Sequence, residues 1–275
     1  MDSLMFELVL LWCTAGLYLL AGILFGYAIA LRKEAGGRRA MIIASAGLLL
    51  HSAALLIRWA ISGHPPYTQK YEIYSVSAWT SVLLFLTLAW RRVKLRLMGI
   101  VIMPLSLPVM AVSLSGSHAV TTLSPSLRGI WFHIHAISNA LTAGASILAV
   151  GASILYLIKE KRAGLQFYKK ISSLDVLDEY AYKCAAFGFI FWSMTVISGA
   201  LWANNTWGRY WAWDPIETWS LITWFMFGLY LHMRHFFRWR GRKAALLLCA
   251  CFCSPVFGLV LLPLFIESIH SGYFQ

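Results

Sequence analysis

Residues 184–237 read CAAFGFIFWSMTVISGALWANNTWGRYWAWDPIETWSLITWFMFGLYLHMRHFF, which is two long apolar runs joined by a segment rich in tryptophan. Each run has about the 20 residues that an α-helix needs to cross the hydrocarbon core of a bilayer. The joining segment, residues 202–219, holds five of the 13 tryptophans of the chain. This pattern predicts two membrane-spanning helices with an aromatic segment at the membrane edge.

The composition of the whole chain is that of a membrane protein. Of its 275 residues, 60% are hydrophobic and 12% are charged, whereas a soluble domain carries about 25% charged residues. We therefore expect an all-α polytopic membrane protein that forms one integral membrane domain, residues 1–275. Eight stretches are long and apolar enough to span a bilayer: residues 5–31, 40–61, 73–90, 97–114, 131–158, 184–203, 218–237 and 244–266. The polar stretch 172–183, which begins with serine, is typical of a helix start that leads into the sixth span.

Basic residues indicate on which side of the membrane each loop lies, because Lys and Arg are retained on the cytoplasmic side. The loops after the first, third, fifth and seventh spans carry most of them: Arg32, Lys33, Arg38, Arg39, Arg91, Arg92, Lys94, Arg96, Lys159, Lys161, Arg162, Lys169, Lys170, Arg234, Arg238, Arg240, Arg242 and Lys243. The opposite loops hold only Lys70, Arg128 and Arg209. Both termini and the tryptophan-rich segment between spans six and seven are therefore expected on the external side. The net charge of +12 reflects this topology and gives no reason to expect nucleic acid as a partner.

The five cysteines lie inside apolar runs, and no two of them form C-x-x-C: they are Cys13, Cys184, Cys249, Cys251 and Cys253. Such positions favour packing over metal binding or thiol redox chemistry. The chain also lacks C-x-x-C-H, so it is not expected to be a c-type cytochrome itself.

Three histidines fall at the external edge of the predicted spans. His133 and His135 open span five, and His270 closes span eight. Residues two apart on a helix point about 200° apart, so only one of His133 and His135 faces the bundle, and the spacing does not choose between them. Two neutral imidazoles from different helices can hold a haem iron through both axial positions. Hydrogen bonding at the interface is the competing interpretation for each single histidine.

Two further histidines, His51 in span two and His232 in span seven, fall at apolar depth. An ionisable group there is expensive and is a functional candidate by default. At 1.5 Å per residue, His232 lies roughly 20 Å below the external edge, towards the cytoplasmic half. A second ligand site at that depth would create a path across the membrane. His51 is a candidate partner, although a hydrogen bond between helices explains either imidazole equally well.

The tryptophan-rich segment has a structural interpretation that comes first. Tryptophan gathers at bilayer interfaces as an anchor. Asp214 and Glu217 have the spacing of a capping box, with Asp214 as the N-cap and Glu217 as the third helical residue, and Pro215 would be the first helical residue. Span seven would start at this cap. This cap would also fix where the preceding rings point.

The functional interpretation is a platform for a flat ligand such as haem. Trp207, Trp211 and Trp213 would line an apolar slot, while glycine permits a close approach of the backbone. The full set of platform residues is Trp202, Trp207, Gly208, Tyr210, Trp211, Trp213, Asp214, Glu217 and Trp219. Haem also carries two carboxylates, for which arginine is a suitable partner. The candidate propionate contacts are Arg58, Arg128 and Arg209.

These residues resemble the CcsA/ResC family of cytochrome c biogenesis proteins, within a wider group of haem-handling proteins that carry a tryptophan-rich WWD segment. The resemblance runs along nearly the whole chain, and its motifs are WGRYWAWDPIETW at 207–219, LITW at 221–224, YLH at 230–232, RWAISGHPP at 58–66, YE at 71–72 and WFHIH at 131–135.

The resemblance implies roles for the external histidines. The family pattern places a histidine four residues after a tryptophan such as Trp131, which selects His135 over His133. The tail HSGY at 270–273 is similar to the C-terminal histidine segment of the family, which more often reads LHSY. His135 and His270 would then ligate haem at the external WWD site.

The resemblance also implies an intramembrane haem site served by His232 and a histidine of a partner subunit. That partner is a CcsB/ResB-like membrane protein, and His51 is then a weaker candidate for the second deep ligand. The absence of a large external domain and the eight spans match the CcsA half of the system rather than the fused form.

The function implied by the resemblance is that of a haem-handling subunit of a cytochrome c synthase, or haem lyase. It would deliver haem b across the membrane and present it for thioether attachment to the C-x-x-C-H thiols of an apocytochrome c. A thioredoxin-like reductant is a further expected partner. The expected location is the bacterial inner membrane or the thylakoid membrane, and no residue stands out as a catalytic acid or base.

Three other functions remain open. A b-type cytochrome or quinol-oxidising subunit would need pairs of histidines within the bilayer, whereas most candidate ligands here fall at one edge. A haem exporter or channel without attachment activity would need polar residues along a path. A WWD relative that hands haem to a chaperone is the third.

Overall fold

The computed structural model describes residues 3–30, 34–162 and 170–258 of the chain. In these residues the structure consists of helices and connecting loops without a β-strand, which confirms the all-α prediction. The α-helices are α1 (Ser3–Ala30), α2 (Glu34–Ser62), α3 (Lys70–Arg91), α4 (Gly99–Leu114), α5 (Ile130–Lys161), α6 (Leu174–Trp207), α7 (Pro215–His235) and α8 (Arg242–Val256). Two 3₁₀-helices, η1 (Val93–Met98) and η2 (Pro125–Arg128), precede α4 and α5.

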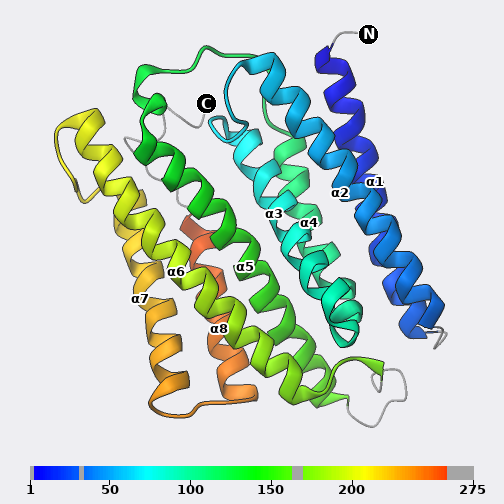
Figure 1. Ribbon diagram of the computed structural model, residues 1–275. Helices are drawn as coiled ribbons and strands as arrows, with labels where there is room; N and C mark the ends of the chain where they lie inside the picture. The colour runs from blue at the N-terminus through cyan, green and yellow to red at the C-terminus, as the bar shows by residue number, and fades with distance from the viewer. Residues whose placement is uncertain (1–2, 31–33, 163–169, 259–275) are drawn as a thin grey trace.

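The helices run up and down in an antiparallel bundle (Figure 1). Helices α2, α4 and α6 end at the upper end of the bundle in this view, where α3, α5 and α7 begin. The tryptophan-rich segment between α6 and α7 therefore lies at the same end as the loop between α2 and α3 and the loop between α4 and α5. This order is the one that the alternation of basic loops predicts.

Among the described residues, six segments are long and apolar enough to cross a bilayer: α1, α2, α3, the continuous η1–α4 segment, α5 and α6. They confirm a multi-pass membrane protein. Helix α7 has 21 residues and α8 has 15 described residues, and neither is among these six. Spans seven and eight therefore stay predictions.

Helix α6 begins well before the predicted start of the sixth span. The hydroxyl of Ser173 accepts a hydrogen bond from the backbone N–H of Val176 at 3.4 Å and caps the helix, as the serine-led start of this stretch predicts. The first three turns are amphipathic, since Leu177 and Ala181 are buried while the polar residues between them are not. A search of the sequence for continuous apolar runs does not detect these first turns of α6, because polar residues interrupt them.

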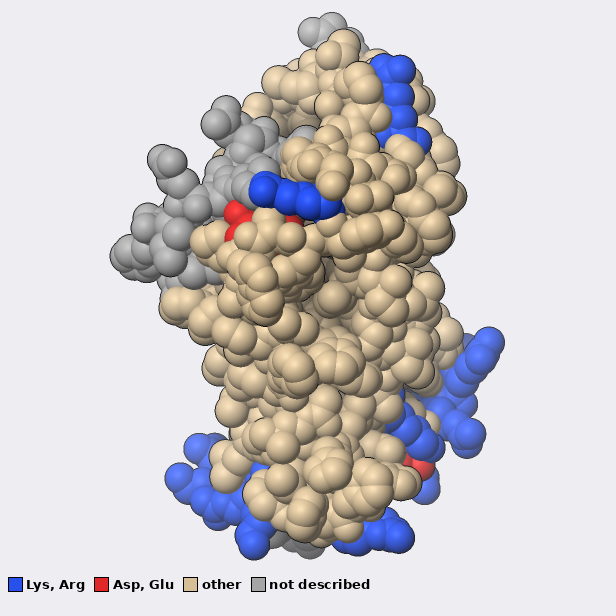
Figure 2. Space-filling model, turned by 90° about the vertical axis from the view of Figure 1, so that its left-hand side faces the viewer, with Lys and Arg blue, Asp and Glu red and all other residues tan. Residues whose placement is uncertain are grey.

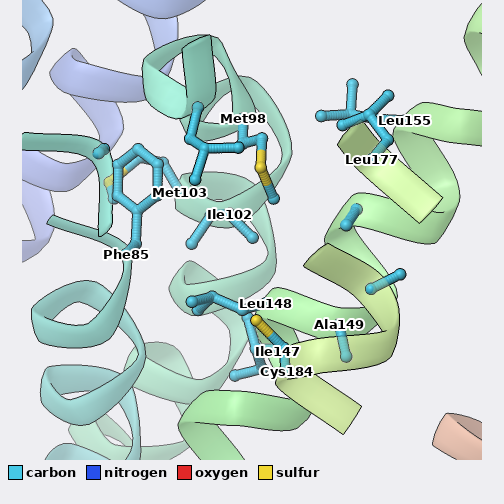
Figure 3. Packing of buried hydrophobic residues seen from close by; sticks show 14 of the residues in the cluster. Phe85, Met98, Ile102, Met103, Ile147, Leu148, Ala149, Leu155, Leu177 and Cys184 are labelled. Carbon is cyan, nitrogen blue, oxygen red and sulfur yellow. The ribbon is translucent and has the colours of Figure 1, made fainter. Parts of the chain in front are cut away.

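Close packing of α5 against its neighbours fixes the frame of the bundle. A Cβ atom at Gly144 would lie 3.0 Å from the backbone nitrogen of Ser81, and one at Gly151 would lie 2.5 Å from Cδ1 of Ile102. Small residues at such places let helix backbones approach each other in a membrane. Figure 3 shows the apolar side chains around this contact, among them Phe85, Met98, Ile102, Met103, Ile147, Leu148, Leu155, Leu177 and Cys184.

Charge is distributed unevenly along the molecule. In Figure 2, Lys and Arg side chains gather around the lower end, whereas few lie near the upper end and the surface between is largely free of charge. This distribution is typical of a bundle that crosses a bilayer with its lower end in the cytoplasm.

Candidate functional site

The tryptophan-rich segment 202–219 is mostly helical, so the irregular part is shorter than the gap between the predicted spans six and seven. Helix α6 continues through Trp207 and ends at Gly208, whose φ of 72° is the left-handed conformation that favours glycine. Helix α7 starts at Pro215. Only the short connection between them is irregular, so the role of Gly208 here is to end a helix.

The start of α7 confirms the predicted capping box. Oδ1 of Asp214 accepts a hydrogen bond from the backbone N–H of Ile216 at 2.9 Å. Oε2 of Glu217 accepts from the backbone N–H of Ala212 at 2.8 Å and from that of Asp214 at 3.4 Å. Both carboxylates therefore hold the short connection in shape.

The tryptophan rings form an inner and an outer group rather than one flat slot. The buried ring of Trp202 packs against Phe132 and Trp207, with centroids 5.4 and 5.3 Å away. Trp211 meets Trp213 edge-on at 6.0 Å in the connection. We call Trp202, Trp207 and Phe132 the inner aromatic group, and Trp211 and Trp213 the outer aromatic group.

The outer aromatic group has two features that suit a ligand. The side chain of Trp213 is 71% exposed, and its φ of 58° is unusual for a bulky residue. The Nε1–H of Trp211 is buried and has no hydrogen-bond partner in the part of the chain that the structure describes. Tyr210 beside them is exposed as well. A buried donor without a partner is costly, so a ligand that accepts a hydrogen bond would remove a penalty here.

His135 lies between α5 and α6 next to the inner aromatic group. Its Nδ1 is 2.9 Å from the carbonyl oxygen of Thr195, and its ring centroid is 6.0 Å from that of Trp202. Since a carbonyl only accepts, Nδ1 carries the proton and the lone pair is on Nε2. Histidines that ligate metals are typically oriented in this way. Gly199 makes the approach possible, because a Cβ there would lie 2.9 Å from Nδ1.

His133 faces a different neighbour. Its Nδ1 lies 3.1 Å from the hydroxyl of Tyr67, in the loop between α2 and α3. The structure thus brings His135, and not His133, onto α6, a choice that the spacing alone leaves open. His270, the other predicted external ligand, lies outside the described residues.

His51 has a structural role, as the hydrogen-bonding interpretation predicts. Its side chain is fully buried, its Nδ1 lies 3.2 Å from the hydroxyl of Tyr18, and its Nε2 lies 2.9 Å from the hydroxyl of Ser75. Both ring nitrogens are therefore used to join α1, α2 and α3. This arrangement excludes His51 as a deep haem ligand in this conformation.

His232 lies near the end of α7 with an exposed side chain. Its ring packs against Phe236 and Phe237, with centroids 4.6 and 5.7 Å away. The imidazole is thus accessible from outside the bundle, where a second subunit could reach it.

The three candidate arginines differ in their surroundings. Arg58 is 1% exposed and is held by Glu72, Gln69 and two backbone carbonyls. Its guanidinium donates to these groups, and its expected role as a propionate contact stays a prediction. Arg128, at the end of η2, and Arg209, within the connection, are both exposed and stay candidates.

The ionic cluster around Arg58 is the main feature that the sequence interpretation missed. Glu7, in the first predicted span, is 1% exposed and its Oε2 lies 3.9 Å from Nη1 of Arg58. A carboxylate inside an apolar run was the available signal, because such a group needs a partner.

An apolar cavity of about 370 Å³ lies among α3 to α8. Each of these helices contributes to its wall, with examples in chain order being Tyr74, Leu105, Asn139, Trp192, Trp219 and Phe252. None of its described lining residues is charged. Asn139 follows His135 by one helical turn on the same face of α5, so the cavity begins just inside the level of His135.

Comparison with known proteins agrees with this architecture. A family model described as cytochrome C assembly protein matches residues 67–270. The cytochrome c biogenesis protein CcsA of Chlamydomonas reinhardtii is 34% identical over 236 residues, which cover 82% of this chain and 66% of that protein. CcsA of Prochlorococcus marinus (strain MIT 9301) is 32% identical over 226 residues, which cover 72% of this chain and 73% of that protein.

A solved structure, cytochrome c heme lyase CcmF, is similar in fold with a TM-score of 0.68 and 17% sequence identity, covering 99% of this chain and 48% of that chain. The chain thus spans just under two thirds of the algal CcsA and about half of CcmF. Because the family model covers more than half of the chain, the chain belongs to the cytochrome c assembly protein family, with the CcsA cytochrome c biogenesis proteins among its relatives.

Proposed function

We propose that this protein is the haem-handling membrane subunit of a cytochrome c synthase, which presents haem b at the upper end of the bundle for attachment to an apocytochrome c. The observation that carries the proposal is the position of His135. Its Nδ1 is bonded to Thr195 of α6, its ring lies beside Trp202, and the apolar cavity begins one turn below it.

Haem is the substrate, and the residues of the chain bind and orient it. His135 supplies one iron ligand through Nε2, and His270 supplies the other. The aromatic residues of 202–219 contact the porphyrin, while Asp214 and Glu217 fix the connection that carries the outer aromatic group. Arg128 and Arg209 are the propionate contacts, since both are exposed and Arg209 lies within this connection.

His232 serves a second, deeper haem site together with a histidine of a CcsB/ResB-like partner. Its exposure on α7 supports this assignment, because a ligand shared between subunits has to face outwards. The committed hydrogen bonds of His51 support it as well, since they remove the competing ligand within this chain.

Delivery from the deep site to the external site uses the cavity among α3 to α8. Its wall is apolar and contains Trp192 and Trp219, which suits the faces of a porphyrin. We expect the basic lower end in the cytoplasm, because Lys and Arg are retained on that side, and therefore the site of attachment on the periplasmic or lumenal side of a bacterial inner membrane or a thylakoid membrane.

Attachment needs positioning more than acid–base catalysis by this chain. Each thiol of the C-x-x-C-H motif adds across one haem vinyl group, so that sulfur bonds to one carbon and hydrogen to the other without net oxidation. The two thiols have to be reduced beforehand, which is the role of a thioredoxin-like reductant. Two axial histidines close the iron to side reactions while the vinyl edges are presented.

The test is reconstitution of the protein and its partner subunit with haem and a peptide that contains C-x-x-C-H. Formation of thioethers is read from the pyridine haemochrome spectrum, whose α band moves to shorter wavelength when the vinyl groups are saturated. We expect product with the wild type and with His133→Ala, and little or none with His135→Ala. Equal product from His135→Ala and the wild type would contradict the proposal.

A haem exporter without attachment activity is the second candidate, because the same cavity would serve it. The same reconstitution separates the two functions. An exporter would bind haem at His135 yet leave the peptide thiols unmodified.

A further inference from the structure

A buried ionic cluster lies at the upper ends of α1, α2 and α3, at the same end of the bundle as the proposed haem site (Figure 1). Nε of Arg58 donates to Oε1 of Glu72 at 2.8 Å, and both side chains are at most 1% exposed. Glu72 also accepts from the backbone N–H and the hydroxyl of Thr68 at 2.9 and 3.0 Å. Charges that are buried in this way hold their geometry tightly, since breaking the pair is expensive.

The cluster also holds the loop between α4 and α5. Nη1 of Arg58 donates to the carbonyl oxygen of His118 at 3.0 Å, and Nη2 donates to that of Ala119 at 3.0 Å. Nε2 of Gln69 donates to the same carbonyl of Ala119 at 3.1 Å and to the hydroxyl of Thr121 at 2.5 Å. The N-terminal part of this loop is therefore anchored to α2 and α3, partly by charge-assisted hydrogen bonds.

The C-terminal part of the same loop is anchored to the haem site. Nε1 of Trp202 donates to the carbonyl oxygen of Ser126 at 2.8 Å. Leu127 is buried against Phe132 and Trp202 in the inner aromatic group. Helix α5, which carries His135, begins at Ile130. We call residues 118–128 the strap, because they join the ionic cluster to Trp202 and to the start of α5.

The strap is short. Six residues, 120–125, separate the anchor at Ala119 from the anchor at Ser126. Each residue spans at most about 3.6 Å, so a shift of the first anchor has few residues in which to be absorbed. The ionic cluster lies on α1 to α3, whereas the ring of His135 is bonded to α6. In the described residues the strap is the direct covalent link from this cluster to the start of α5.

We propose that Arg58 is a positioning residue for the external haem site, which it controls through the strap without touching haem. This proposal rests on the proposed roles of His135 and Trp202 in haem binding. If the ion pair had only a local role, it would stabilise α1 to α3. Hydrogen exchange over residues 124–134 would then stay unchanged when the contacts of Arg58 or Gln69 with the strap are removed.

The experiment compares backbone hydrogen–deuterium exchange in the full-length protein, purified without haem, for the wild type, Arg58→Gln and Gln69→Ala. Gln69→Ala removes the Nε2 contacts to the strap and the 3.2 Å hydrogen bond from Nη2 of Arg58, while Arg58 keeps its pair with Glu72 and its own bonds to the strap. It therefore tests whether the strap carries the effect if Arg58→Gln does not fold. Arg234→Gln is the matched control, because it removes a half-buried ion pair with Asp178 at the opposite end of the bundle. We expect exchange about tenfold faster over residues 118–134 in both strap variants and unchanged there in the control.

The second readout is the haem spectrum of the same variants after haem is added. We expect a weakened or heterogeneous low-spin spectrum when the strap is released. Faster exchange confined to 118–121, or a loosened strap with an unchanged haem spectrum, would overturn the proposal while leaving haem binding by His135 intact. If the wild-type protein bound no haem through His135, the proposed function would fail, and this inference with it. A failure of this inference alone is recognised by the outcomes above, in which the wild type still binds haem through His135.

Discussion

The carbonyl oxygen of Thr195 lies 2.9 Å from Nδ1 of His135 and fixes the imidazole against α6 with its lone pair on Nε2. The contact joins two helices whose residues lie 60 positions apart in the sequence. It orients the ring before any ligand binds, as outer-shell hydrogen bonds do for metal-binding histidines. In the proposed function, the orientation of His135 for haem binding depends on this one contact.

Replacement of Gly199 by alanine should displace His135. The new Cβ would lie 2.9 Å from Nδ1 and 3.1 Å from Cε1 of the ring, so the ring or α6 has to move. We expect a loss of stability of roughly 1–3 kcal/mol and a shift of bound haem away from the low-spin state in the optical spectrum. Gly16→Ala is the control, because nothing lies within 4 Å of a Cβ at that position. Identical spectra for both variants would show that the close approach has no role.

Replacement of His51 by alanine should destabilise the protein without changing the haem spectrum. The change leaves the buried Tyr18 and Ser75 hydroxyls without their shared partner, at a cost of roughly 1–3 kcal/mol. Thermal unfolding in detergent measures the loss of stability. The optical spectrum after haem is added shows whether haem binding is unchanged. Loss of a haem signal from properly folded His51→Ala would instead make this residue a ligand.

Removal of the α7 cap should loosen the outer aromatic group. In Asp214→Ala the backbone N–H of Ile216 loses its acceptor, which typically costs about 1 kcal/mol. The connection before α7 should then be cleaved faster in limited proteolysis, while Asp214→Asn, which retains a cap, should behave like the wild type. Equal cleavage of all three proteins would contradict the structural role of the cap.

The stability of the protein should fall as the pH is lowered below neutrality. His118 lies in the loop between α4 and α5, and burial lowers the pKa of its imidazole from the ordinary value of 6.5. The folded state therefore binds this proton more weakly than the unfolded state, so this contribution is fully present above pH 6.5 and is lost as the pH falls towards the lowered pKa. Thermal unfolding between pH 7.5 and 5 measures it, and His118→Phe should give a flatter profile. A slope that is the same in this variant would assign the pH dependence to other groups.

The sequence predicts the helical membrane fold well, because apolar runs and basic loops carry that information directly. It also predicts the capping box at Asp214 and Glu217, which depends on neighbours in the chain. It does not predict that Arg58 would be buried between Glu7 and Glu72, since this depends on the packing of three helices. Spacing alone leaves the choice between His133 and His135 open, and the family resemblance selects His135. The tertiary structure adds that His135 packs against α6, where Gly199 creates the space. The position of His270 and the sides of the termini stay predictions.

The most direct test of the central claim is the low-temperature electron paramagnetic resonance spectrum of ferric haem bound to the protein with His135 replaced by glycine. The account predicts that the low-spin bis-histidine signal of the wild type is lost in His135→Gly, returns when imidazole is added, and persists in His133→Gly. An unchanged low-spin signal in His135→Gly would contradict the claim that His135 ligates the iron.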